Sequence, residues 1–533
     1  MCSRSPRYKY AMDPLDAIDL DADDGCNRHS GSDDPLDSIP IAEPLVPEPV
    51  ELEPWATAIA EFFKRRNTSL EHLRGRCICY SGDCSGAEGA YTGLSCVLEA
   101  FRNLLNIDIS CRYRSGSEIP GALGLPPKLY HRWNHKPEHF FDGMEQRLQR
   151  SSPDVFNNNT VVDMDSFCED TIYHNGFICK DLSSANRTSR KPLDTTLSSS
   201  SGASSKTLHA GLAWVDKHHM PITMTENTYS ADTIQKLLRL YSVHFPMYVV
   251  VIFVLNSLRF GLKAARRRLF CLGLNMEKME IITPIEQWPD ILRQLASGLP
   301  QMDIDSIILD DASPIVKQTF CETRDKAQTK QWDGARYDHL RARNAISKRF
   351  NVRIPAPPPC RKQLFRRSSV TANSDRYKDH LAVACSRCKP PLCKLIESKW
   401  FGSLSDRKQD RLLLETWVRC LLGAGTNAKL LWNMTNGLEY PCRKDPSFDS
   451  FVGCICTEHD IWVTWKQRLM CGYEQMLLQG LFPPLLPVAL SYPHEIRKSI
   501  EHISKIYGTP PVGLGAGFDR FLIDFRSVSV DLR

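Results

Sequence analysis

Hydrophobic positions along the chain alternate between short apolar runs and longer stretches with helical spacing. Four short runs are bounded by polar or turn residues, as buried strands are: 77–80, 221–225, 249–255 and 268–274. In three longer stretches apolar residues recur every three or four positions, which predicts helices: 57–66, 92–105 and 231–241. Strands and helices in alternation favour an α/β sheet of buried parallel strands.

The regions between these elements have a different character. Residues 107–110 predict one more strand, and the Gly- and Pro-rich stretch 112–132 predicts a loop. A Ser-rich stretch within 189–206 is typical of a flexible insert. Between 331 and 410 we find no α/β alternation, which indicates a separate, irregular region.

Four regions follow along the 533 residues. Residues 1–53 are acidic and Pro-rich, so we expect a disordered tail. Residues 54–275 form the α/β core, and 276–461 a basic region. Residues 462–533 return to the core.

Charge is distributed unevenly along the chain. Residues 1–53 carry four Lys and Arg against thirteen Asp and Glu, so the net charge of +5 leaves +14 for the rest. Residues 331–410 alone hold eighteen Lys and Arg against seven Asp and Glu. A basic body suits a polyanionic partner such as nucleic acid, and it also suits solubility. No stretch approaches the ~20 apolar residues of a spanning helix, which excludes a polytopic membrane protein.

Twenty cysteines without a regular spacing indicate reduced thiols in a cytosolic or nuclear protein. The tightest cluster is Cys385, Cys388 and Cys393. A zinc site there would need a fourth ligand, so no metal is expected.

Four short motifs could carry chemistry. The Gly-rich segment, residues 81–94, follows a predicted strand, and its Gly86 and Gly89 would let the backbone approach a nucleotide-like cofactor. The Cys179 segment, residues 176–186, holds a candidate nucleophile. Glu226 ends a strand, and Arg266 and Arg268 alternate just before another, so they point the same way. Singly, such residues are more often a buried thiol, a solvated acid and a solvated basic edge than parts of a site.

In this order and spacing, the motifs resemble those of the cytosine-5 DNA methyltransferase family, which uses S-adenosylmethionine. YSGDCSGAEGAYTGL is similar to the family's Gly-rich turn, and GFICKDLS to its Pro-Cys loop, with Cys179 at the nucleophile position. TENT resembles the Glu-Asn-Val motif through Glu226. NSLRFGLKAARRRLF resembles the segment that ends in Arg-x-Arg, with Arg266 and Arg268.

Two further stretches fit the resemblance. PEHFFDGMEQRL resembles the segment ending the family's third strand, where an acid near Asp142 would face the cofactor. RLMCGYEQMLLQGLFP is similar to a late motif that supports the recognition domain, with Arg468, Glu474 and Gln479. The last family motif is faintly echoed in residues 512–521.

The resemblance implies a Rossmann-like, S-adenosylmethionine-dependent methyltransferase domain with a smaller, irregular target-recognition domain in the basic region. It implies that Cys179 adds to cytosine C6, that Glu226 holds or protonates N3, and that Arg266 and Arg268 hold the base or a phosphate. The implied cofactor contacts are Gly86, Glu88, Gly89 and Asp142. The implied partner is double-stranded DNA and the implied state a monomer. The basic runs that end at Arg349 and Arg367 suggest nuclear import, with the cytoplasm as the alternative.

Several positions depart from the family pattern. Ile178 replaces the Pro before the nucleophile, Lys180 the following Gln, and Ala264 the Gln before Arg-x-Arg. The acid expected to bind the cofactor ribose is open between Asp108 and Glu118. The alternatives are therefore a non-catalytic nucleic-acid-binding protein, an RNA cytosine-5 methyltransferase, and a small-molecule methyltransferase.

Overall fold

The computed structural model describes residues 9–10, 54–66, 70–84, 89–118, 131, 136–177, 202–329, 336–356, 377–386, 388–423, 429–434, 452 and 460–480. These residues fall into two compact units. The first unit consists mainly of residues 25–303 and includes the chain from Met476 onward. The second unit consists mainly of Ile304–Gln475.

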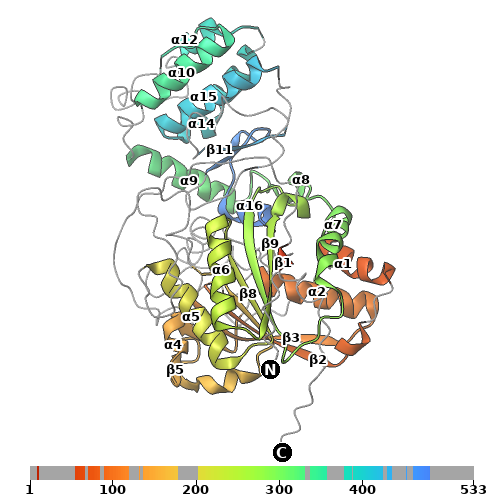
Figure 1. Ribbon diagram of the computed structural model, residues 1–533. Coiled ribbons are helices and arrows are strands. Elements are labelled where there is room, and N and C mark those ends of the chain that lie inside the picture. Colours follow the sequence, from red (N-terminus) through yellow and green to blue (C-terminus); the bar gives the residue numbers. More distant parts are fainter. Residues whose placement is uncertain are drawn as a thin grey trace, which may run out of the picture. The chain divides into compact units, whose positions relative to one another are not determined.

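One eight-stranded sheet forms the centre of the first unit, in the order β1-β9-β10-β8-β7-β2-β3-β4 (Figure 1). Its strands are β1 Lys9–Tyr10, β2 Arg76–Asp83, β3 Ile109–Glu118, β4 His139–Asp142, β7 Ile172–Asn175, β8 Ile222–Thr228, β9 Tyr248–Asn256 and β10 Arg267–Asn275. Counted in chain order from β2 and read from the β4 edge, the first five strands have the order 3-2-1-4-5 of a Rossmann sheet, and they are all parallel. The predicted Rossmann-like α/β fold is confirmed.

The last strand departs from the expectation of a wholly parallel sheet. β10 runs antiparallel to both β8 and β9. Only residues 257–266 connect β9 to β10, and they include no more than a short 3-10 turn, η4 Ser257–Phe260. A parallel connection needs a crossover of a dozen or more residues, so the chain reverses here.

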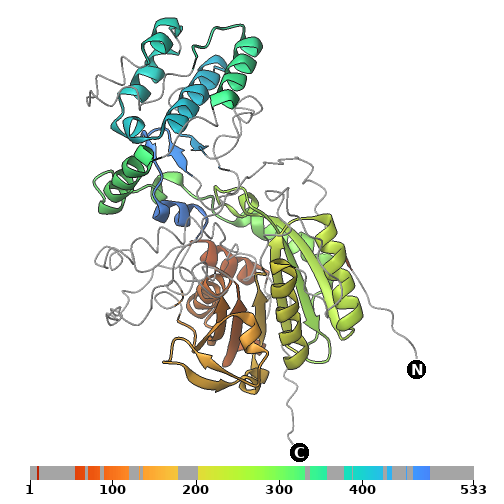
Figure 2. The same ribbon diagram turned by 90° about the vertical axis from the view of Figure 1, so that its left-hand side faces the viewer.

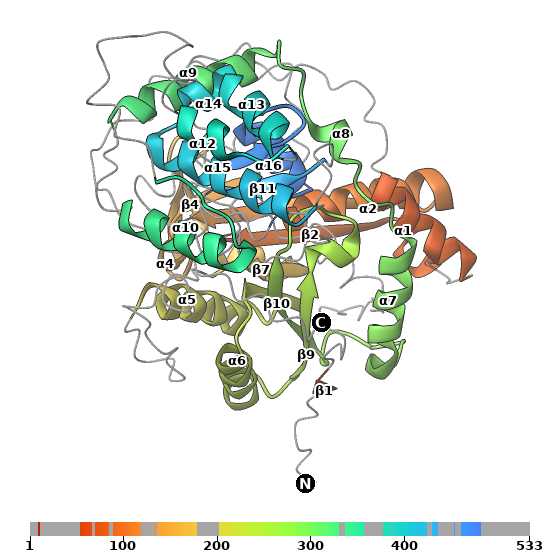
Figure 3. The same ribbon diagram turned by 90° about the horizontal axis from the view of Figure 1, so that it is seen from above.

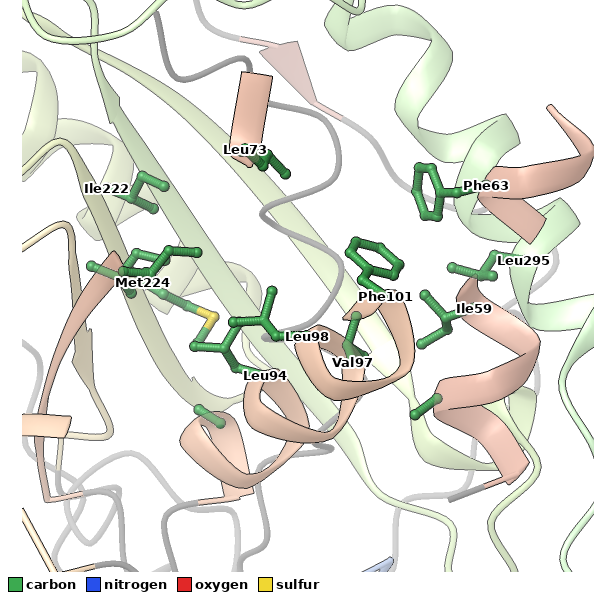
Figure 4. Packing of buried hydrophobic residues seen from close by; sticks show 14 of the residues in the cluster. Ile59, Phe63, Leu73, Leu94, Val97, Leu98, Phe101, Ile222, Met224 and Leu295 are labelled. Atoms are coloured by element: carbon green, nitrogen blue, oxygen red, sulfur yellow. The ribbon is translucent and has the colours of Figure 1, made fainter. Parts of the chain in front are cut away.

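Helices cover both faces of the sheet (Figures 1 and 3). One face carries α1 Pro54–Arg65, α2 Gly89–Leu105 and α7 Trp288–Gly298, which share a buried apolar cluster with β2, β8, β9 and β10. Figure 4 shows Ile59, Val97, Phe101 and Leu295 meeting in this cluster. The other face carries α5 Ala203–His218 and α6 Ala231–His244, which pack on a second cluster. The predicted helices at 57–66, 92–105 and 231–241 are confirmed.

Three predictions of irregular structure in the first unit are wrong. Lys9–Tyr10, within the expected disordered tail, form β1 and pair with β9. β3 continues to Glu118, beyond Arg112 where a loop was expected, because Ser115–Glu118 pair with β4 as a parallel strand. α5 begins at Ala203, inside the expected Ser-rich insert. Leu208 and Leu212, one helical turn apart, are buried in the second cluster, and their burial stabilises the helix despite its polar first turn.

Shorter elements complete the first unit. They are η2 Glu71–Leu73, α4 Met144–Arg147, the antiparallel hairpin of β5 Ser151–Asp154 and β6 Thr160–Asp163, η3 Met164–Glu169 and η5 Ile285–Gln287.

The second unit was expected to be irregular, but its described part is mostly helical (Figure 2). It contains α8 Ile304–Ile307, α9 Pro314–Thr329, α10 Arg336–Phe350, α12 Lys378–Val383, α13 Lys389–Glu397, α14 Lys399–Ser403 and α15 Asp406–Leu421. A three-stranded antiparallel sheet follows, with β11 Leu431–Asn433, β12 Ile461–Val463 and β13 Arg468–Leu469, and then α16 Gly472–Leu478.

Polar residues hide the helical pattern of α15 in the sequence. Its Asp410 is fully buried and forms ion pairs with His339 and Arg343 of α10. The Arg343 guanidinium and the His339 imidazole, together with hydrogen bonds from both, hold the pKa of Asp410 below its ordinary value against the effect of burial. Charged residues therefore lie in the interior of this unit. For this reason the polarity of the sequence wrongly suggests that this face of α15 is exposed to solvent.

The boundary between the two units lies further along the chain than the boundary expected from the sequence. It falls at Asp303 instead of residue 275, because α7 packs with α1 in the first unit's apolar cluster. The first unit resumes at Met476, whereas the sequence pattern places the return at 462. The three-stranded sheet between 431 and 469 accounts for this difference, since it belongs to the second unit.

Candidate active site

Polar residues lie where the parallel strands end, along the C-terminal edge of the sheet. β2 ends at Asp83, β3 at Glu118, β4 at Asp142 and β7 at Asn175. Glu226 lies near the end of the next strand, β8. In a Rossmann sheet, ligands bind outside this edge, so these residues are placed where a site is expected.

Glu226, Arg266 and Arg268 come together at the end of β8. The Arg268 Nε lies 3.0 Å and the Arg266 guanidinium 3.9 Å from the same Glu226 oxygen, Oε1. β10 makes this possible because it runs antiparallel, with Arg268 opposite Thr228 and Phe270 opposite Glu226. All three charged side chains are buried, with exposed fractions of 9%, 3% and 8% in the same order.

This carboxylate is held by charge and is not saturated by hydrogen bonds. Among the described residues, Glu226 Oε1 accepts no hydrogen bond of good geometry, although two guanidinium groups lie near it. Buried hydrogen-bond acceptors in folded proteins nearly always have a hydrogen-bond partner. The group therefore keeps acceptor capacity for a ligand.

Ser257 fixes the backbone of Arg266. Its hydroxyl donates to the Ala264 carbonyl and accepts from the Arg266 amide, at 2.9 Å. Ala264 stands where the family has Gln, and its own side chain is buried. The Ser257 hydroxyl thus holds the backbone of the segment that carries the two arginines, although no Gln is present at position 264.

Cys179 lies outside the described residues, but the chain leading to it is anchored beside Glu226. The Asn227 side-chain amide donates to the Phe177 carbonyl at 2.7 Å. The Gly176 amide donates to the Asp83 carbonyl at 2.9 Å. The start of the Cys179 segment is therefore attached to the ends of both β8 and β2.

The cofactor candidates are partly described. Gly86 and Glu88 lie outside the described residues, while Gly89 opens α2 directly after them. Asp142 ends β4, opposite Glu118 in the strand register. Carboxylates on this edge, next to a helix that begins with glycine, suit the hydroxyls and amino group of an adenosyl cofactor.

The structure separates the two candidates for the ribose-binding acid. Glu118 ends β3 on the same edge as Asp142, and its carboxylate lies 3.9 Å from His131 Nε2. Asp108 precedes β3, and its carbonyl accepts from Gly75, which precedes β2. Asp108 therefore lies at the opposite edge, which leaves Glu118 as the candidate.

A buried polar network beneath this edge was missed by the sequence reasoning. The Asp83 carboxylate accepts hydrogen bonds from Ser117 and Tyr173, both at 2.6 Å, and pairs with Arg147. Burial first, and then the Asp83 charge, raise the pKa of Tyr173 well above its ordinary value, so Tyr173 remains a donor. The signal in the sequence was Asp83 itself, an acid three residues after the predicted strand 77–80.

The late motif also forms a buried ion pair, within the second unit. Arg468 contacts Glu474 and Asp311 at 2.7 Å each, and Glu474 also accepts from the backbone amides of Leu309 and Cys471. Arg468 and Glu474, named in the sequence only as members of one motif, thus contact each other within this unit.

No group of three or more His, Cys, Asp or Glu side chains is placed to hold a metal ion in the described ranges. The thiols of Cys385 and Cys388 lie 3.2 Å apart at the start of α13. None of the described helices is long and apolar enough to cross a membrane.

No family model matches the sequence, and no curated protein matches it. Three solved structures have low similarity to the chain. A putative DNA modification methyltransferase encoded within an E. coli prophage is 13% identical, at a TM-score of 0.27, over 44% of this chain and 56% of its own. The Dnmt2 methyltransferase of S. pombe is 12% identical, at 0.27, over 44% and 60%. A DNMT2 mutant of Spodoptera frugiperda is 11% identical, at 0.29, over 65% and 99%.

The matched part spans little more than half the length of the first two structures. TM-scores this low carry no argument about function. The function of this chain is therefore inferred from the residues at the sheet edge.

Proposed function

We propose that this chain transfers a methyl group from S-adenosylmethionine to C5 of cytosine in DNA, through a covalent Cys179–C6 adduct on a flipped base. The convergence of Glu226, Arg266 and Arg268 carries the proposal. These residues come from two strands and meet beside the backbone that leads to Cys179. Three residues that occur in the order of the family's motifs and also meet in space rarely do so by chance.

The chemistry needs each of these groups. Cytosine C5 is too weak a nucleophile to take a methyl group directly. The Cys179 thiolate adds to C6, which makes C5 an enamine carbon, while Glu226 protonates or holds N3 and so limits the charge that develops on the ring. C5 would then take the electrophilic methyl that bound S-adenosylmethionine supplies, and S-adenosylhomocysteine would leave. The proton on C5 then leaves to a base, and elimination of the thiolate restores the free enzyme.

The arginines have two tasks in this scheme. Their charges keep Glu226 close to the sheet edge and favour a thiolate nearby. Arg266 and Arg268 would also hold the base or a neighbouring phosphate. Removing the target base from the stack exposes it to these groups, as in other enzymes that modify bases.

A polyanionic partner is supported by the exposed cations of the second unit. They include Arg341, Lys348, Arg349, Arg353, Lys378 and Lys389. Phosphate contacts of this kind position a duplex without reading its sequence. We propose double-stranded DNA as the substrate, with RNA as the alternative that the same chemistry allows.

The test is methyl transfer from labelled S-adenosylmethionine to mixed-sequence duplex DNA and, separately, to tRNA. We expect incorporation by the wild type and none by Cys179→Ala. Cys168→Ala is the matched control, because Cys168 is an exposed thiol of the same unit, and it should keep full activity. A wild type that binds the cofactor by calorimetry but methylates neither nucleic acid would contradict the proposal.

A non-catalytic role is favoured by one observation, the loss of the family's Pro and Gln at Ile178 and Lys180. A protein of this kind would bind DNA with a steep dependence on salt and transfer no methyl group. A mechanism-based cytosine analogue separates the two functions, since only the enzyme forms a stable adduct with it through Cys179.

A further inference from the structure

We propose that the buried Asp83–Arg147 pair is a positioning group that fixes the Gly-rich segment and the Cys179 segment to each other. Neither residue contacts substrate in this scheme; both act through the backbone that they hold. The catalytic consequence rests on the proposed function, whereas the mechanical linkage does not.

Asp83 joins three elements at the end of β2. Its carboxylate accepts from Ser117 of β3 and Tyr173 of β7, and it pairs with Arg147, the last residue of α4. The residue is 1% exposed. A carboxylate with several strong donors in a dry setting is held in one place, because moving it would break charged hydrogen bonds without help from water.

Arg147 makes two further contacts besides the ion pair. Its guanidinium donates to Ser115 at 2.8 Å and lies 4.1 Å from the centre of the Trp214 ring of α5. It is as deeply buried as Asp83. A buried ion pair is often no more stabilising than well-packed apolar residues of the same volume, so its benefit here is a unique geometry.

Both chemical segments leave from this point. The Cys84 amide donates to the Ser117 carbonyl at 2.8 Å, and Cys84 adopts a left-handed backbone with φ of 49° at the entry to the Gly-rich turn. The Gly176 amide donates to the Asp83 carbonyl. One residue, Asp83, therefore anchors the first turn of one segment through its side chain and the start of the other through its backbone.

Tight packing behind Tyr173 limits any movement. At Gly211 of α5, an added Cβ would lie 1.9 Å from the Asn175 side-chain nitrogen and 3.0 Å from the Tyr173 hydroxyl. The α5 backbone thus presses directly on the last residues of β7. This packing limits the movement of Tyr173 away from Asp83, so we expect a change at Asp83 to reach the end of β7 and Gly176.

The experiment compares Tyr173→Phe with Tyr241→Phe. Both tyrosines are 1% exposed and lie in the same apolar cluster. Tyr173→Phe removes the hydrogen bond to Asp83, and Tyr241→Phe removes hydroxyl hydrogen bonds with Thr223 and Thr225, away from Asp83. The first readout is hydrogen exchange of the Cys84 and Gly176 amides, at a temperature where both variants are fully folded. We expect exchange at both amides to rise together by roughly tenfold in Tyr173→Phe and to stay unchanged in Tyr241→Phe.

The second readout is functional. In Tyr173→Phe the affinity for S-adenosylmethionine and the rate of covalent trapping by Cys179 should fall together, by several-fold each, while Tyr241→Phe keeps both. Exchange that stays at the wild-type rate, or rises at only one of the two amides, would overturn the linkage. If the wild type transfers no methyl group, only the proposed function is contradicted. The linkage is still established when hydrogen exchange rises at both amides in Tyr173→Phe.

Discussion

Two arginine–carboxylate pairs lie at the same edge of the sheet, yet they are built differently. Asp83 accepts hydrogen bonds from Ser117, Tyr173 and Arg147 and is 1% exposed. Glu226 lies between Arg266 and Arg268 with 9% exposure, and its Oε1 accepts no hydrogen bond from the described residues. The first carboxylate is saturated, and the second retains capacity.

The difference separates a structural acid from a reactive one. A saturated carboxylate cannot take up a proton or a ligand without losing a partner, so it serves to fix the backbone. An unsaturated carboxylate beside cations can still accept a hydrogen bond from a ligand. Glu474 in the second unit belongs to the saturated kind, since Arg468 and two backbone amides surround it. Counting hydrogen bonds thus sorts acids that look alike in sequence.

The largest expected effect follows from the unsaturated acid. Glu226→Gln should lower the methyl-transfer rate by about 10²–10⁴-fold, because Gln cannot protonate cytosine N3. The free energy of unfolding should fall as well, because the buried Arg266 and Arg268 lose the charge of Glu226, so rates are compared where the variant is fully folded. Initial rates and denaturant unfolding measure the two quantities. Glu277→Gln, at an exposed acid just after β10, is the control, and a rate equal to wild type in Glu226→Gln would break the comparison.

The next effect belongs to the saturated acid. Asp83→Asn should lower the free energy of unfolding by about 3–5 kcal/mol, because it leaves Arg147 buried without its counter-charge. Adding Arg147→Met to this variant should restore part of the loss. Urea unfolding with a fixed m-value provides the measurement. A loss below about 1 kcal/mol would place this pair with ordinary surface ion pairs.

Asp170, a third buried acid of the first unit, makes the free energy of unfolding depend on pH. Burial raises the pKa of its carboxyl from 3.8 to about 6, although a hydrogen bond from Ser81 and the charges of Arg147 and Arg114 lower it. The folded protein therefore holds this proton more tightly than the unfolded chain does. The stability that this group contributes is complete below pH ~4 and is lost as pH rises through about 6.

Asp170→Asn removes this titration. Relative to the variant, the wild type should lose up to about 3 kcal/mol of stability between pH 4 and pH 7. Unfolding by denaturant at several pH values measures the difference. Asp165→Asn is a control of opposite sign, because a hydrogen bond from Lys217 lowers the pKa of that exposed carboxyl. A wild type and Asp170→Asn variant with parallel pH profiles would show that Asp170 stays ionised in the fold.

The sequence by itself located five strands and three helices of the first unit and proposed Glu226, Arg266 and Arg268 as site residues. Periodicity located these strands because buried strands are continuously apolar, and motif spacing pointed to the three residues because the proposed chemistry restricts the residue types. It failed for the helical second unit, where buried ion pairs such as Asp410 with Arg343 imitate a polar surface.

Only the tertiary structure decided which residues meet. The antiparallel direction of β10 brings Arg268 to Glu226, and the strand ends select Glu118 over Asp108. The Asp83–Arg147 pair joins residues 64 positions apart, and no local pattern marks such a partner. Local periodicity reports which face of an element is buried, whereas contacts between distant residues exist only once the chain has folded.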